Sequence, residues 1–94
     1  MKFFKRSLGQ NFLIDKNISK KIINLINFKN KHILEIGPGK GALTDQILKK
    51  NPKTLTLVEK DFELSKYLKK KYHFKKNIKV VNGDILKLNL KKLF

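Results

Sequence analysis

Three acids and a glycine-rich turn are the residues of this chain best suited to chemistry. An apolar segment ends at Ile36, glycines follow at positions 37, 39 and 41, and a segment with helical spacing comes next. Glu35 lies just before the turn, and Glu59 and Asp84 stand at the ends of two later apolar segments. A strand, a glycine turn and a helix in this order build a nucleotide-cofactor site in open α/β sheets. The pattern therefore predicts a cofactor pocket at the carboxyl end of a sheet.

The glycine turn departs from the dinucleotide-binding fingerprint. Gly37, Gly39 and Ala42 satisfy G-x-G-x-x-G/A, but the third glycine falls early, at position 41. The carboxylate of Glu35 would repel a pyrophosphate, whereas it would attract a cofactor that carries an ammonium and a sulfonium group. We therefore expect S-adenosylmethionine in this pocket. The alternative interpretation of Glu35 is a buried acid that is neutralised by a lysine such as Lys40.

The other two acids are placed to recognise an adenosine. Glu59 follows Gly39 by roughly the 20 residues that separate the turn from the ribose-binding acid in such folds, so its carboxylate can accept hydrogen bonds from ribose hydroxyls. Asp84, after the third apolar segment, can accept one from the adenine amino group. Each acid also has a plain alternative. Glu59 would then be a solvated acid at a strand end, and Asp84 part of an ordinary Gly-Asp turn.

The elements that must position these residues follow from periodicity. Strands are predicted over residues 32–36, 54–58 and 78–81, with helices over about 42–50 and 62–72. Asp15 is the predicted N-cap of an earlier helix that runs to about residue 26. We expect the N-terminal half of a Rossmann-like α/β methyltransferase sheet, with three parallel strands and their helices. Residues 1–14 would form a basic arm, and residues 15–94 a partial cofactor-binding domain.

The charge of the chain predicts a polyanionic partner. Lysine and arginine total 23 against seven acids, which gives a net charge of +16. Such an excess favours nucleic acid as the partner. Only Arg6 is an arginine, however, so a coding bias toward A+T-rich codons is the alternative explanation of the lysines.

Several classes of site are excluded or disfavoured by composition. The chain has no cysteine, so disulfides and thiolate metal sites are excluded, and a cytoplasmic location is expected. His32 and His73 lack metal-ligand spacing, and no metal site is predicted. Tyr67 and Tyr72 are interpreted as packing residues of a helix. No apolar segment approaches the roughly 20 residues that cross a bilayer, and we expect neither a membrane association nor an obligate protein partner.

Two peptides resemble the start of the ribosomal RNA adenine N6-dimethyltransferases. They are KRSLGQNFLID at residues 5–15 and EIGPGKGALT at residues 35–44, and VEKD at 58–61 and GD at 83–84 continue the match in order. The GQNFL peptide ahead of the glycine turn narrows the resemblance to this family. It implies S-adenosylmethionine-dependent dimethylation of adenine N6 in small-subunit ribosomal RNA. Carried over by position, the family's cofactor contacts fall on Asn11, Leu13, Gly37, Glu59 and Asp84.

The resemblance does not supply catalytic residues within these 94 residues. In the family, an Asn-Leu-Pro-Tyr-type peptide after the fourth strand grips the amino group of the flipped adenine, and no such peptide occurs here. We therefore interpret the chain as the cofactor-binding portion, inactive by itself. Without a fourth strand, residues 32–36 would have an unpaired edge, which predicts marginal stability and self-association. The alternatives are a non-catalytic RNA-binding module and an NAD-type dinucleotide-binding domain.

Overall fold

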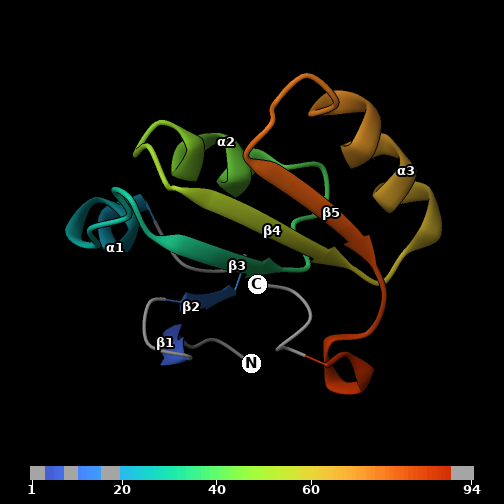
Figure 1. Cartoon of the computed structure of the whole chain (residues 1–94), viewed down its shortest axis with the longest axis horizontal. Helices are drawn as coiled ribbons and strands as arrows, with labels where there is room; N and C mark the ends of the chain where they lie inside the picture. Colours follow the sequence, from blue (N-terminus) through green and yellow to red (C-terminus); the bar gives the residue numbers. More distant parts are fainter. Residues whose placement is uncertain (1–3, 8–10, 16–19, 90–94) are drawn as a thin grey trace.

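A five-stranded sheet organises the part of the chain that the computed structural model describes, namely residues 4–7, 11–15 and 20–89. The strands lie in sequence order (Figure 1) and are β1 (Phe4–Ser7), β2 (Asn11–Asp15), β3 (His32–Ile36), β4 (Thr54–Glu59) and β5 (Ile78–Asn82). β2 to β5 are parallel to one another, and β1 is antiparallel to β2. The carboxyl ends of β3, β4 and β5 therefore meet at one edge of the sheet, which is where the three acids were expected.

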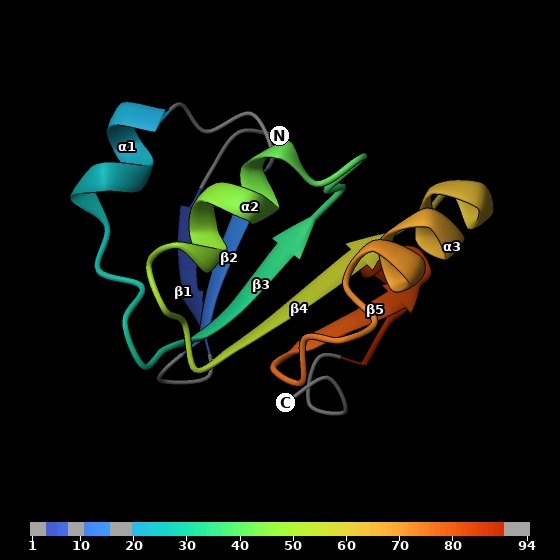
Figure 2. The same cartoon turned by 90° about the horizontal axis from the view of Figure 1, so that it is seen from above.

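Three helices pack on one side of this sheet (Figures 1 and 2). They are α1 (Lys20–Leu25), α2 (Ala42–Leu48) and α3 (Phe62–Lys71), and a short 3-10 helix, η1 (Ile85–Lys87), follows β5. Asp61 is the N-cap of α3, and its side chain accepts a hydrogen bond from the Leu64 N–H at 2.9 Å. Such an N-cap satisfies a backbone donor that the helix itself leaves unpaired.

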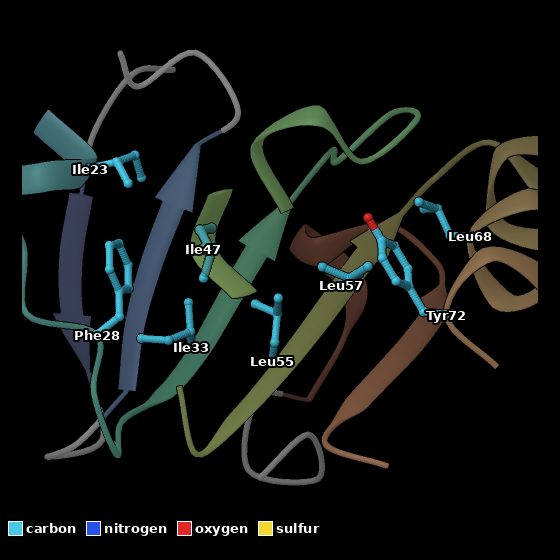
Figure 3. Packing of buried hydrophobic residues seen from close by; sticks show 8 residues of the cluster. All are labelled: Ile23, Phe28, Ile33, Ile47, Leu55, Leu57, Leu68 and Tyr72. Atoms are coloured by element: carbon cyan, nitrogen blue, oxygen red, sulfur yellow. The ribbon is translucent and has the colours of Figure 1, made fainter. Parts of the chain in front are cut away.

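The core lies between the strands and the three helices (Figure 3). Ile33, Leu55 and Leu57 project from β3 and β4 toward side chains of all three helices and of the segment after α1. Leu34 and Val58, on the alternate face of the same strands, are also buried. Burial on both faces is usual in parallel sheets, and here it includes polar side chains, since Glu35 and Thr56 are buried as well. The cluster consists of Ile23, Phe28, Ile33, Ile47, Leu55, Leu57, Leu68 and Tyr72.

The three predicted parallel strands and the two helices between them are confirmed, with small differences at their ends. The N-terminal region differs from the prediction. Asp15 is the last residue of β2 and not a helix N-cap, and the described helix begins at Lys20. β2 also crosses the predicted boundary between the arm and the domain. The physical reason is that the apolar run from Phe12 to Ile14 pairs with β3, a contact that local periodicity does not reveal.

This pairing also corrects the expectation of an unpaired edge at β3. Each residue of β3 has a partner in β2, from Asn11 opposite His32 to Asp15 opposite Ile36. On its other side β3 pairs with β4. The edge strands of the described sheet are therefore β1 and β5.

Candidate cofactor site

The glycine turn after β3 is built from left-handed backbone. Gly39 has φ 61° and Gly41 has φ 91°, a region that residues with a Cβ rarely adopt. The Gly41 N–H donates to the Pro38 carbonyl at 3.0 Å, which closes the turn before α2 begins. A Cβ built on Gly39 would meet no atom within 4 Å, so this side of the turn faces open space. A ligand can therefore approach the backbone at Gly39.

Glu59 links the end of β4 to the glycine turn. Its side chain is almost buried, and its Oε1 accepts a hydrogen bond from the Gly39 N–H at 3.2 Å. Its Oε2 accepts one from the Asp61 N–H at 2.9 Å. The Asn82 side chain in turn donates to the Glu59 carbonyl at 3.0 Å. Each carboxylate oxygen has a second lone pair, so Glu59 can hold the turn and still accept hydrogen bonds from ligand hydroxyls.

Asp84 follows β5 and is half-buried at the neighbouring position. Its Oδ1 accepts a hydrogen bond from the Leu86 N–H at 2.9 Å, which caps η1. Its Oδ2 lies 4.0 Å from the Lys60 ammonium group, whose side chain is 81% exposed. An ion pair this exposed contributes little energy. Asp84 therefore keeps acceptor capacity for a ligand.

Gly37, Glu59 and Asp84 line the same hollow at the carboxyl end of the sheet, which measures about 110 Å³. Its remaining lining combines apolar and polar groups from the same three strand ends, namely Ile36, Val58, Lys60, Gly83 and Ile85. Apolar side chains beside two acids suit a flat heteroaromatic ring that carries hydroxyl and amino donors. The volume is below the roughly 300–1,000 Å³ of whole ligand pockets, so the described residues enclose only part of the space that such a ligand needs.

Glu35 is placed differently from the expectation. Its side chain is fully buried beneath the turn, does not line the hollow, and accepts a hydrogen bond from the Thr44 hydroxyl at 2.7 Å. Its Oε2 has no hydrogen-bond partner within the described part of the chain. Burial, opposed by the Thr44 hydrogen bond and assisted by the charge of Asp45, raises its pKa from 4.5 to about 7. Glu35 is thus a buried acid that holds a proton readily, and among the described lysines none forms an ion pair with it.

The two N-terminal candidates lie apart from this group. Asn11 pairs with His32 at the first residue of β3, whereas the glycine turn follows its last residue. Leu13 pairs with Leu34 in the middle of the strand. The structure thus brings Gly37, Glu59 and Asp84 together, and it places the backbone of Asn11 at the opposite end of β3. The side chains of Asn11 and Leu13 lie outside the described residues.

Several residues around the turn were not predicted from the sequence. Lys60 and Ile85 line the hollow, and their only sequence signal is adjacency to Glu59 and Asp84. Tyr72, interpreted as a packing residue, also reaches the carbonyl of Gly41 with its hydroxyl. These two residues are 31 positions apart, so no local pattern could have joined them.

Two kinds of feature are absent from the described residues. No helix among them is long and apolar enough to cross a membrane. Within the same ranges, no three His, Cys, Asp or Glu side chains gather in a way that could hold a metal ion.

A parallel sheet with a glycine turn after one strand and acids after the next two is the arrangement of Rossmann-like methyltransferases. A solved structure supports this class. It is a candidate RNA methyltransferase from Pyrococcus horikoshii, 30% identical to this chain, with a TM-score of 0.61 over 70% of this chain and 33% of that one. The family model described as ribosomal RNA adenine dimethylase matches residues 1–94, so the chain belongs to that family.

Curated relatives agree with this assignment, and each is named ribosomal RNA small subunit methyltransferase A. The protein of Pelagibacter ubique is 54% identical over 90% of this chain. That of Wigglesworthia glossinidia brevipalpis is 54% identical over 95%, and that of Malacoplasma penetrans 48% over 96%. These matches cover 32%, 34% and 32% of the relatives. The chain therefore spans about a third of the length of the curated relatives it matches.

Proposed function

We propose that this chain is the cofactor-binding part of an enzyme that uses S-adenosylmethionine to dimethylate adenine N6 in small-subunit ribosomal RNA. The observation that carries the proposal is the convergence of Gly37, Glu59 and Asp84 on one hollow. The family match and the names of the relatives support the reaction and the substrate. An NAD-type function is not retained, because the chain belongs to a dimethylase family.

The residues of the hollow fit the proposed cofactor. Glu59 would accept hydrogen bonds from the ribose hydroxyls, and Asp84 one from the adenine amino group. Ile36, Val58 and Ile85 would contact the apolar faces of the base. The open backbone at Gly39 leaves room for a ligand beside the turn. When bound, S-adenosylmethionine supplies an electrophilic methyl group on its sulfonium.

Two further residues enter the proposal through family resemblance. Asn11 and Leu13 match cofactor-contacting positions of the dimethyltransferases. They lie in β2, next to β3. We assign catalysis to no described residue, because methyl transfer requires groups that hold the adenine amino group and none of the described residues is suited to that role.

Ribosomal RNA is the proposed partner, and the cytoplasm the proposed location. The net charge of +16 favours association with a polyanion. No obligate protein partner is part of the proposal.

Ligand selectivity tests the proposed function directly. Calorimetric titration of the 94-residue chain with S-adenosylhomocysteine should show saturable binding, whereas NAD⁺ should show none under the same conditions. S-adenosylhomocysteine is the suitable probe because it keeps the adenosine and the amino-acid tail but cannot donate a methyl group. Equal binding of both ligands, or binding of NAD⁺ alone, would overturn the proposed cofactor.

A further inference from the structure

We infer that the carboxyl-terminal end of α3 positions the glycine turn for its ligand, through a group of three residues that we name the α3 clamp: Asp45, Lys71 and Tyr72. The identity of that ligand rests on the proposed function, but the clamp itself rests on contacts within the described chain. It also accounts for the glycine at position 41, which the dinucleotide fingerprint does not require.

The clamp holds two consecutive carbonyl groups of the turn. The Lys71 ammonium group donates to the Lys40 carbonyl at 2.9 Å and to Asp45 Oδ2 at 3.1 Å. The Tyr72 hydroxyl donates to Asp45 Oδ1 at 2.6 Å and lies 3.2 Å from the Gly41 carbonyl oxygen. Asp45, in the first turn of α2, thus receives hydrogen bonds from both residues of α3's end. The turn, α2 and α3 are joined at one point.

Tyr72 is buried in a way that requires these polar partners. It is 6% exposed, and its ring belongs to the core cluster, where Figure 3 shows it beside Leu57 with the hydroxyl oxygen in red. A buried hydroxyl without a partner would destabilise the fold. Burial, the hydrogen bond to Asp45 and the charge of that carboxylate raise the pKa of Tyr72, so its hydroxyl stays protonated and remains a donor.

The turn has no cap of its own that could replace the clamp. Gly41 is the N-cap of α2 and offers no side-chain hydrogen bond to the helix. A Cβ at Gly41 would clash with the Tyr72 hydroxyl oxygen and would lie 3.2 Å from the Lys71 nitrogen. The absence of a Cβ therefore lets α3 approach the turn. Gly39 leaves space for a ligand, and Gly41 leaves space for the clamp.

The turn is consequently held from two sides. Glu59 binds the Gly39 N–H from the β4 side, and the clamp binds the carbonyl groups of residues 40 and 41 from the α3 side. A binding loop that is already held in its bound shape loses less conformational freedom when the ligand arrives. Tyr72 and Lys71 are therefore positioning residues for ligand affinity, although neither lines the hollow.

The test compares Tyr72→Phe with Tyr67→Phe in the 94-residue chain. Both variants remove one tyrosine hydroxyl, but the Tyr67 side chain is 45% exposed, and its contact with the clamp is that of its ring with the Lys71 ammonium group at 6.0 Å, which phenylalanine keeps. Tyr72→Phe should weaken S-adenosylhomocysteine binding by up to about tenfold, because the ligand must then order a turn that is held less firmly. Tyr67→Phe should leave the affinity unchanged.

Amide hydrogen exchange, measured without ligand, distinguishes the clamp from a general contribution of Tyr72 to stability. Only the clamp predicts a change that is confined to the turn. Tyr72→Phe should speed exchange at residues 39–45 and leave the central amides of β4 as in the unchanged chain. Lys71→Gln, at a partly exposed position that is less prone to unfold the chain, should show the same local pattern. A double variant gives a further check. Gly41→Ala should weaken binding less when Tyr72→Phe is also present than when it is made alone, because the hydroxyl that the new Cβ would meet is gone.

The outcomes separate the clamp from the proposed function. If the unchanged chain fails to bind S-adenosylhomocysteine, the proposed cofactor is wrong, and the exchange experiment still decides the clamp. Uniformly faster exchange throughout β3, β4 and β5 would show that Tyr72 only contributes to global stability. Unchanged exchange at residues 39–45 in both Tyr72→Phe and Lys71→Gln would likewise overturn the clamp.

Discussion

At the residue scale, the acids of the site differ in how their charge is used. Glu59 is bound to two backbone N–H groups and keeps lone pairs for a ligand. Glu35 is fully buried, and one of its oxygens has no partner among the described residues. Glu59 thus holds the turn and is the proposed recognition residue, whereas Glu35 is a proton-binding group beneath the turn. Substitution should separate these two roles.

Removal of the Glu59 carboxylate should weaken the binding of S-adenosylhomocysteine. For Glu59→Ala we expect a loss of about 1–3 kcal/mol, the range for hydrogen bonds to a charged group. Glu59→Gln should give an intermediate loss, because it keeps one acceptor but loses the charge. Calorimetry measures both effects, with the exposed Glu63→Ala as the control of equal charge change. Unchanged affinity in Glu59→Ala would remove this residue from the site.

Glu35 should make stability depend on pH. Its pKa in the folded chain, about 7, lies above its ordinary value of 4.5. The folded state therefore binds the proton more tightly than the unfolded state, and the stability that this provides is complete below pH 4.5 and is lost as pH rises through 7. In thermal melts between pH 5 and pH 8, the unchanged chain should lose stability relative to Glu35→Gln. Parallel curves for the two chains would contradict the raised pKa, and Glu63→Gln serves as the exposed control.

The sequence indicated which of the candidate residues would lie close together, because their positions follow from strand order alone. Glu59 and Asp84 stand at the ends of adjacent parallel strands, so their meeting with Gly37 required only the order of the strands. The orientation of Glu35 also had a signal, since alternation places it on the same face of β3 as the core residue Ile33. The contact between Tyr72 and the turn had no signal in the sequence, because it depends on how α3 packs against α2.

At the element scale, β2 is the feature that the sequence pattern did not indicate. From the sequence alone, these residues could equally form the packed end of a basic arm. Their strand geometry follows from pairing with β1 and β3. Local propensity is a weak guide where such pairing decides the outcome. The start of α1 was misplaced for the same reason, since Asp15 belongs to the paired strand.

Interruption of β2 should expose the edge of β3. β2 lies between two strands, so its backbone N–H groups belong to the hydrogen-bonded ladders, and Leu13→Pro removes one of them. We expect lower thermal stability and concentration-dependent self-association, because an unpaired strand edge invites pairing between chains. Leu13→Val keeps the N–H group and should remain like the unchanged chain. Sedimentation that shows the same monomer for both variants would argue against β2 as the cover of this edge.

At the scale of the whole molecule, charge is distributed unevenly along the fold. The residues from Leu64 to Gly83 include seven lysines and no acid. They comprise most of α3, β5 and the connection between them, where Phe74 is 68% exposed. The acids Glu59, Asp61 and Asp84 lie instead at the carboxyl end of the sheet. Residues 16–34 also contain five lysines and no acid, so composition can produce such a stretch, and an experiment must separate a functional surface from coding bias.

The salt dependence of RNA binding can separate a functional lysine surface from general composition. We would compare two variants with equal loss of charge, one with Lys69, Lys70, Lys75 and Lys76 replaced by Gln, and one with the exposed Lys21, Lys29, Lys53 and Lys87 replaced. If the first set contacts phosphates, its slope of log affinity against log salt should fall by up to about 3, given roughly 0.7 per phosphate contact on a single strand. The second variant should keep nearly the slope of the unchanged chain, because charges distant from the RNA release few counterions.

Fluorescence anisotropy with a single-stranded fragment of ribosomal RNA provides the measurement. Equal slopes for both variants would attribute the +16 charge to composition, and a flat slope for the unchanged chain would remove RNA as the partner of this part of the protein.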